Sequence, residues 1–282
     1  MLKYRVLTGG LFLGLVAALY LWAPGWGLGV VILGFTLLAL LEIIPLLTKA
    51  GFPALKWTSL LVSLLWMLGV WGEFSIENNS RELRWMMPAI SAWVVFLGCL
   101  FRSDQRMSLE KLAGSFFAIA YVPGLMQFLL LILFLEGNGE GDGRSLLLYG
   151  ILVVKSTDMG AYFIGSAIGR HKLIPAISPA KSWEGVVGGV LVAMGVSSLL
   201  LLLFGYTISG TAFTWRDGLI LGAGLAVFGV LGDLVESMLK RSAQVKDSGA
   251  WLKGMGGILD VLDSLIFAFP LLYLYVAWGL NG

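Results

Sequence analysis

The chain has 282 residues, of which 58% are hydrophobic and 13% are charged, and its mean hydropathy is +0.89. Soluble chains carry about 25% charged residues, so an ordinary soluble domain is excluded. The 19 basic and 17 acidic residues leave a net charge of only +2, and nucleic acid is not expected as a partner. The single cysteine, Cys99, excludes an intrachain disulfide and a cysteine-cluster metal site.

Apolar runs of roughly 17 to 25 residues, a length that crosses a bilayer as a helix, alternate with short charged segments along the chain. They lie near residues 6–22, 27–44, 57–71, 85–101, 112–135, 146–168, 184–208, 218–238 and 258–278. These runs predict an all-α, polytopic integral membrane protein with about nine transmembrane helices. The first run has no clear signal-peptide cleavage pattern, so we expect it to be retained.

Basic residues are concentrated on alternate loops, which hold most of the 19 Lys and Arg. The opposite loops contain only Arg81, Arg84, Arg144 and Arg216. Because an excess of Lys and Arg marks the cytoplasmic side, we predict a cytoplasmic N-terminus. We expect a multi-pass protein of the cell (inner) membrane, with the loops 169–183 and 239–257 on the cytoplasmic face.

The chain divides into two regions of different character. Residues 1–135 hold about five predicted spans with charges only at their ends, whereas residues 146–278 hold about four spans that carry polar groups. Small residues recur four apart in several spans, as Gly10/Gly14, Gly165/Gly169 and Gly185/Gly189. Such spacings let helix backbones approach closely, which we interpret as packing within the bundle; a homodimer through one of these faces is the alternative.

Two segments before residue 190 place polar groups where a cavity could form. Lys155 and Asp158 lie three residues apart on one helical face, and we interpret them as the polar wall of an active-site cavity. A structural ion pair between helices is the alternative. Ser178 and Pro179 predict a helix start, with Ser178 as N-cap. The free amides at that helix end, together with Lys181, would then bind a phosphate.

The strongest signal comes from the last two runs and the loop between them. Asp233 lies near the cytoplasmic end of one run, and Asp260 and Asp263 lie near the cytoplasmic start of the next. Carboxylates, substrate phosphates and water are the ligands that Mg²⁺ prefers, so these three residues predict a magnesium site. The intervening loop combines basic side chains with glycines that let backbone amides approach phosphate oxygens.

At these residues the chain resembles the phosphatidate cytidylyltransferase (CDP-diacylglycerol synthase) family. The family signature runs from Ser-x-x-Lys-Arg through Lys-Asp and Gly-His-Gly-Gly to Asp-Arg-x-Asp. It is matched by Ser237, Lys240, Arg241, Lys246, Asp247, Gly254, Gly256, Gly257, Asp260 and Asp263. Two further family patches are matched by Ser178 to Gly185 and by Thr157 to Gly165. Met255 replaces the signature His, Val261 replaces the Arg, and Ala180 replaces a Lys.

The resemblance implies that CTP and phosphatidate react to CDP-diacylglycerol and pyrophosphate, for phospholipid synthesis. Mg²⁺ would be held by Asp233 and Asp260, with Asp263 as a further ligand or as support for the ligands. Asp158 would line the cavity or support a second cation. The catalytic group would be Lys240, Arg241, Lys246 and Asp247, with the basic side chains on the triphosphate. Substrate binding would fall to Ser178, Lys181, Asp158, Gly254, Gly256 and Gly257.

Two other functions remain open from the residues. One is a nucleotidyltransferase acting on a different lipid phosphate, and the other is an ion transporter, because buried charges and broken spans also mark transport sites. His171 is the only histidine in the chain. A phosphate monoester has a second pKa near 6, so the lipid phosphate needs no general base, and we predict that His171 does not act as one.

Overall fold

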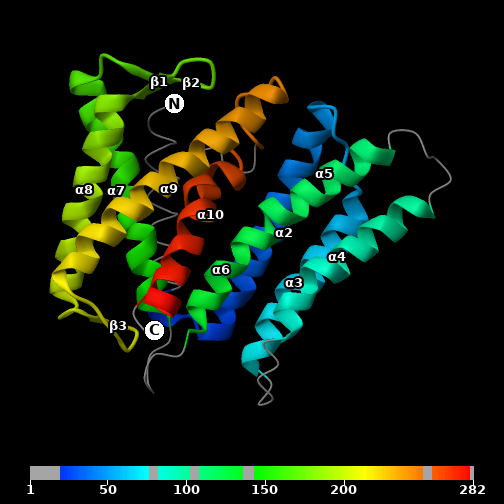
Figure 1. The fold of residues 1–282 in the computed structure, drawn as a ribbon, viewed down its shortest axis with the longest axis horizontal. Helices are drawn as coiled ribbons and strands as arrows, with labels where there is room; N and C mark the ends of the chain where they lie inside the picture. Colours follow the sequence, from blue (N-terminus) through cyan, green and yellow to red (C-terminus); the bar gives the residue numbers. More distant parts are fainter. Residues whose placement is uncertain (1–19, 76–81, 102–107, 136–142, 250–255, 280–282) are drawn as a thin grey trace. The chain divides into compact units, whose positions relative to one another are not determined.

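The computed structural model describes residues 20–75, 82–101, 108–135, 143–249 and 256–279 (Figure 1). These residues form long helices and two short β-hairpins, which confirms a mainly all-α fold. The elements are α2 (Gly25–Lys49), α3 (Lys56–Ser75), α4 (Glu82–Leu100), α5 (Ser108–Tyr121), α6 (Pro123–Leu133), α7 (Arg144–Ile168), β1 (Lys172–Ile174), β2 (Ser178–Ser182), α8 (Trp183–Leu203), β3 (Thr207–Ile208), β4 (Thr211–Ala212), α9 (Trp215–Ser242), α10 (Leu259–Leu274) and the π-helical turn η1 (Tyr275–Gly279).

Every predicted apolar run from 27–44 onward coincides with a helix or with two consecutive helices. The run 112–135 is divided between α5 and α6, and α6 begins at Pro123, whose missing N–H is tolerated in a first turn. Among the described residues, six helical stretches are long and apolar enough to cross a membrane. The helices α3 and α4 are not among these six, and the run 6–22 falls almost wholly outside the described residues.

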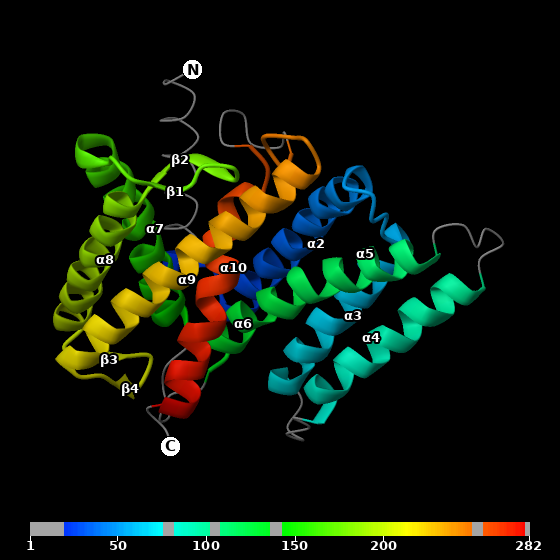
Figure 2. The same cartoon turned by 45° about the horizontal axis from the view of Figure 1, so that its top comes forward.

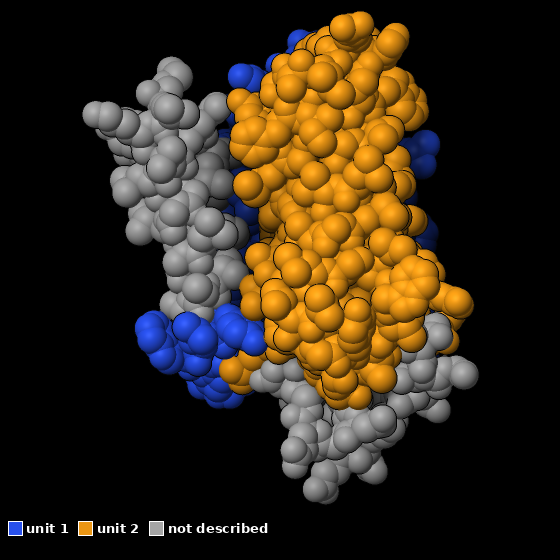
Figure 3. Space-filling model, turned by 90° about the vertical axis from the view of Figure 1, so that its left-hand side faces the viewer, with its two compact units in different colours: residues 1–130, 239–261 blue, residues 131–238, 262–282 orange. Residues whose placement is uncertain are grey.

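The chain forms two compact units, which Figure 3 shows in different colours. Unit 1 consists of residues 1–130 and 239–261, and unit 2 consists of residues 131–238 and 262–282. The sequence alone groups the loop 239–257 with the second region of the chain. In the structure, the described residues 239–249 and 256–257 of this segment are grouped with residues 1–130 in unit 1.

Within unit 1, the helices α2 to α5 pack against one another, and α3 lies beside α4 in both ribbon views (Figures 1 and 2). Leu40, Ile43 and Met67 are fully buried in this unit. The backbone amide of Leu55 donates to Ser115 Oγ at 2.8 Å and joins the start of α3 to α5. The helices of unit 1 therefore pack around an apolar core.

Within unit 2, α7 and α8 run side by side and share the largest interface between elements (Figures 1 and 2). A Cβ at Gly165 would lie 3.3 Å from the Cα of Gly185, and one at Gly189 would lie 2.8 Å from the carbonyl oxygen of Thr157. The spacings Gly165/Gly169 and Gly185/Gly189 therefore serve packing within the chain, as predicted. Gly10 and Gly14 lie outside the described residues.

The predicted helix start at Ser178 is wrong. Residues Ser178–Ser182 form the strand β2, which pairs antiparallel with β1. Pro179 is compatible with an extended Ser178, and the pairing with β1 keeps the segment extended up to Ser182. The helix α8 begins at Trp183, and its N-cap is Ser182, whose Oγ accepts a hydrogen bond from the Gly185 amide at 3.2 Å.

Candidate active site

A polar cavity of about 470 Å³ opens in unit 2, with walls from α7, β1, β2, α8 and α9. Its lining includes Asp158, Tyr162, Lys172, Lys181, Gly185 and Asp233. Asp158 and Tyr162 belong to one family patch and Lys181 and Gly185 to another, and Asp233 lies about fifty residues further along the chain. Ala180, which stands where the resemblance implies a lysine, also lines the cavity.

An ion pair between Lys181 and Asp233 crosses this cavity. Lys181 Nζ lies 2.7 Å from Asp233 Oδ2, and the two side chains are 21% and 31% exposed. The hydroxyl of Ser237 donates to the other carboxylate oxygen at 3.3 Å, one turn further along α9. The structure therefore joins two residues to which the sequence assigned separate roles in phosphate and metal binding.

Lys155 and Asp158 share a helical face, as their spacing predicted, and form an ion pair with Nζ and Oδ2 3.4 Å apart. Both residues belong to α7, so the pair does not connect two helices. Asp158 also lines the polar cavity, which supports the interpretation of this segment as a cavity wall.

Asp263 lies in α10 and is only 7% exposed. Its Oδ1 accepts hydrogen bonds from the amide of Ser264 at 2.5 Å and from the hydroxyl of Ser264 at 3.0 Å. Its carboxyl group also contacts the fully buried Glu236 of α9. The sequence analysis missed Glu236, although a carboxylate within a membrane span is itself a signal of a functional or paired group.

A second cluster, in unit 1, is centred on Asp260 at the start of α10. Lys240 Nζ lies 2.6 Å from Asp260 Oδ1, and these side chains are 13% and 10% exposed. The other oxygen, Oδ2, accepts from the Ser248 amide at 3.0 Å, the Ser248 hydroxyl at 2.8 Å and the Gly257 amide at 2.7 Å. The Gly257 amide, which the sequence analysis assigned to phosphate, is thus bound to a carboxylate.

Glu42 of α2 completes this cluster, and the sequence analysis missed it. Its carboxylate accepts hydrogen bonds from the amides of Ile258 at 2.9 Å and Leu259 at 2.8 Å. A lone carboxylate at position 42 of an apolar run could have drawn attention, but nothing in the local sequence indicates what it binds.

The remaining predicted site residues are less enclosed or lie elsewhere. Arg241, Lys246 and Asp247 are exposed, Ser178 lies in β2 opposite Ile174, and Gly254 and Met255 lie outside the described residues. Val261 is buried in α10, so an apolar side chain suits its surroundings there.

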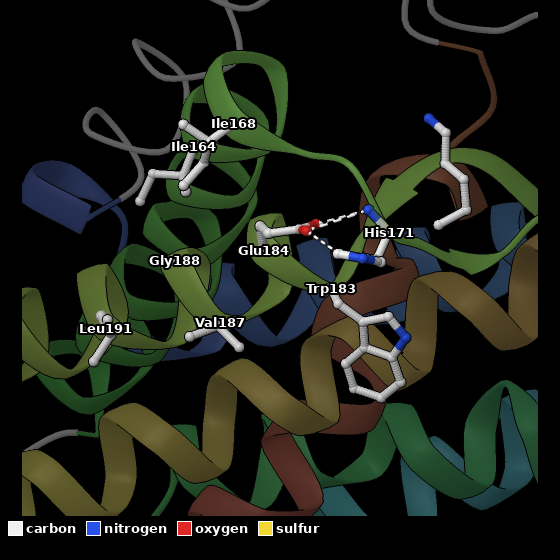
Figure 4. Close-up of a pocket in the computed structure, with 9 residues that line it drawn as sticks. Ile164, Ile168, His171, Trp183, Glu184, Val187, Gly188 and Leu191 are labelled. Carbon is white, nitrogen blue, oxygen red and sulfur yellow. Dashed lines mark hydrogen bonds and ion pairs between the residues drawn. The ribbon is translucent and has the colours of Figure 1, made fainter.

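A shallow apolar groove of about 820 Å³ lies along α7 and α8 (Figure 4). Ile164, Val187 and Leu191 line it, and Lys172 borders both this groove and the polar cavity. At one end, Glu184 Oε1 lies 2.6 Å from His171 Nδ1, and the backbone amide of His171 donates to the same carboxylate. Glu184 therefore ties the start of α8 to the turn before β1.

The predicted magnesium ligands are divided between the two units: Asp233 and Asp263 belong to unit 2, and Asp260 belongs to unit 1. Within the described ranges, no three His, Cys, Asp or Glu side chains come together as a metal site. Carboxylate oxygens are nonetheless the donors that Mg²⁺ takes in proteins, and Asp233 already compensates a positive charge from Lys181.

Comparison with known proteins agrees with the motifs. The model of the cytidylyltransferase family matches residues 3–278. The phosphatidate cytidylyltransferase of Bacillus subtilis (strain 168) is 34% identical over 214 residues, which cover 76% of each chain. That of Staphylococcus haemolyticus is 40% identical over 179 residues, covering 63% of this chain and 64% of the relative. That of Haemophilus influenzae is 44% identical over 132 residues, covering 45% and 44%. This chain belongs to the cytidylyltransferase family.

Proposed function

We propose that this chain transfers the cytidylyl group of CTP to phosphatidate, giving CDP-diacylglycerol and pyrophosphate. The family match and the names of the relatives support this reaction. The observation that carries it is the polar cavity of unit 2, in which Lys181 and Asp233 meet at 2.7 Å between apolar helices. Such a site offers a cation for a lipid phosphate beside a carboxylate for a metal ion.

In the reaction, a phosphate oxygen of the lipid attacks the α-phosphorus of CTP and forms the new P–O bond. The bond from this phosphorus to the bridging oxygen breaks, and its electron pair leaves with pyrophosphate. Phosphoryl-type transfers depend mainly on positioning and charge stabilisation. Lys181 would bind the lipid phosphate or the departing pyrophosphate, and Lys240, Arg241 and Lys246 would stabilise the triphosphate.

Asp233 and Asp263 would hold Mg²⁺ in unit 2, and the participation of Asp260 stays a prediction. A bound Mg²⁺ would neutralise charge on the phosphates during transfer. The ammonium of Lys181 would then leave Asp233 and bind a phosphate, because each of these contacts is an ion pair. A second cation and a role for Asp158 in supporting it stay predictions as well.

The apolar groove is suited to the acyl chains of the lipid substrate, because Lys172 borders it and also lines the polar cavity. A Val187→Trp variant would fill part of the groove and should raise the KM for phosphatidate several-fold while leaving the KM for CTP unchanged. Leu199→Trp, which changes another exposed position of α8, is the matched control. Equal effects of the two variants would contradict the assignment.

We further propose about nine spans, a cytoplasmic N-terminus and an active site on the cytoplasmic face, because basic residues are concentrated on alternate loops. Cysteine labelling from outside intact cells should reach positions in 137–144 and at 281 and should miss 171–177 and 247–253. Labelling of 247–253 from outside would contradict this orientation.

The decisive experiment incubates purified protein with labelled CTP and phosphatidate, with and without Mg²⁺. We expect labelled CDP-diacylglycerol to form only when Mg²⁺ is present. A product formed only from another lipid phosphate would favour the related transferase. Ion flux in liposomes without any transfer would favour a transporter.

A further inference from the structure

Glu42 is a buried carboxylate whose described contacts all lie more than two hundred residues away. It is 4% exposed, and its partners are the Ser248 hydroxyl and the amides of Ile258 and Leu259. An ionised carboxylate loses much hydration energy on burial and stays buried only when hydrogen bonds compensate. The contacts made by Glu42 supply this compensation, so the carboxylate and the segment that it binds depend on each other.

Two of these contacts bind backbone amides at the start of α10. The first amides of a helix have no partner within the helix, and they favour negative charge. Glu42 accepts from Ile258 and Leu259, and Asp260 accepts from Gly257. Carboxylates of the protein therefore occupy a helix end that could otherwise bind a ligand phosphate. The phosphates of a nucleotide would then bind to side chains such as Lys240.

Three glycines leave room for the two carboxylates. A Cβ at Gly249 or Gly257 would collide with the carboxylate of Glu42, and one at Gly256 would collide with that of Asp260. Gly256 also has φ of +90°, a conformation that other residues rarely adopt. Close contact with the two carboxylates therefore explains why these three positions are glycine.

Ser248 connects the two acidic residues. Its hydroxyl lies 3.1 Å from Glu42 Oε2 and 2.8 Å from Asp260 Oδ2, and its amide also donates to Asp260. Asp260 in turn holds Lys240 at 2.6 Å. A chain of contacts therefore leads from α2 to a lysine that the proposed function places on the triphosphate.

We propose that Glu42 is a positioning residue for cytidylyl transfer, whose carboxylate holds Ser248 and the start of α10 so that Asp260 and Lys240 keep their orientation. The inference rests on the proposed function for its kinetic consequence, but the structural restraint can be measured without activity. Glu42→Gln keeps the size of the side chain and replaces one acceptor oxygen with a donor group that faces a backbone N–H.

The first test is hydrogen–deuterium exchange of the purified full chain. In Glu42→Gln, the amides of Ile258 and Leu259 should exchange about tenfold faster, the scale of losing a helix cap. Thr36→Ala is the matched control, because Thr36 is also fully buried in α2 but donates to Ile32 of its own helix. Unchanged exchange at these amides in Glu42→Gln would overturn the proposal, whether or not the wild type transfers cytidylyl groups.

The second test separates positioning from stability. Glu42→Gln should lower kcat/KM for CTP by roughly tenfold to a hundredfold, the range expected when a catalytic geometry is loosened, and leave the KM for phosphatidate within about twofold. Ser248→Ala removes the connecting hydroxyl and should act in the same direction, and the double variant should be less than additive. Faster exchange with unchanged kinetics for CTP, or additive effects of the two variants, would reduce Glu42 to a structural residue and overturn the proposal.

Discussion

Two carboxylates, Asp233 in unit 2 and Glu42 in unit 1, differ in their partners and in their exposure. In unit 2, the partners of Asp233 are the side chains of Lys181 and Ser237, and the carboxylate is 31% exposed. In unit 1, Glu42 binds mainly backbone amides and is 4% exposed. Side-chain partners can rotate away when a metal ion or phosphate arrives, whereas amides at a helix start cannot. Asp233 is therefore suited to exchange ligands, and Glu42 is suited to hold a backbone in place.

Asp260 combines both kinds of contact, since it binds the ammonium of Lys240 and the amides of Ser248 and Gly257. This mixture gives the comparison its sharpest test. Loss of its charge should affect catalysis and local structure together, whereas loss of charge at Asp233 should affect catalysis alone.

The largest expected effect is therefore that of Asp233→Asn and Asp260→Asn. Each variant should lower turnover at least about a hundredfold, the scale of losing a key electrostatic group. Only Asp260→Asn should also accelerate hydrogen–deuterium exchange at the start of α10. Near-full Mg²⁺-dependent activity in either variant, measured with labelled CTP, would remove that residue from the site.

Lys181→Ala should have the next largest effect. It removes the cation that faces Asp233, so kcat/KM for phosphatidate should fall by roughly tenfold to a hundredfold, as for a lost charged hydrogen bond worth about 1.5–3 kcal/mol. Lys49→Ala is a useful control, because Lys49 is an exposed lysine in the last turn of α2 without a predicted role in the reaction. An unchanged kcat/KM in Lys181→Ala would show that the lipid phosphate is bound elsewhere.

Substitution of glycines tests how tightly the Glu42 carboxylate is packed in unit 1. In Gly257→Ala the new methyl group would collide with the Glu42 carboxylate and the Ser248 hydroxyl, and overpacking of this kind costs about 1–3 kcal/mol. Gly34→Ala, in α2 with no atom within 4 Å of the added Cβ, should instead stabilise the fold by about 0.5–1 kcal/mol. Thermal unfolding in detergent would measure both, and equal shifts would contradict the close contact at Gly257.

His171→Gln should have the smallest effect, with activity retained within about tenfold, below the usual 10²–10⁴ contribution of a general base. His171 is largely exposed and its ring contacts Glu184, so the variant should loosen the turn before β1 at most. A folded His171→Gln protein with a thousandfold loss of turnover would make His171 the base and contradict the mechanism.

Patterns that repeat along the chain could be predicted without a structure. The apolar runs predicted the helices, because a segment that crosses a membrane must pair its backbone N–H and C=O groups within the helix. The spacing of Lys155 and Asp158 predicted that they share a helical face, because residues three apart lie on the same side of a helix, and in the structure they are close enough to pair. Small residues at Gly165 and Gly185 predicted a close helix contact for a similar reason.

Contacts between distant segments were decided only by the tertiary structure. Ser178 was wrongly predicted as an N-cap because a strand pairing with β1, which local sequence does not reveal, competes with the helix start. The partners of Lys181, Asp260 and Glu42 likewise come from other segments. The sequence alone determined which charged residues lie in the apolar helices, because composition and periodicity depend only on residues that are close together in the chain. Which charge compensates which depends on how the helices pack, because a buried carboxylate accepts whatever donors the fold brings within reach.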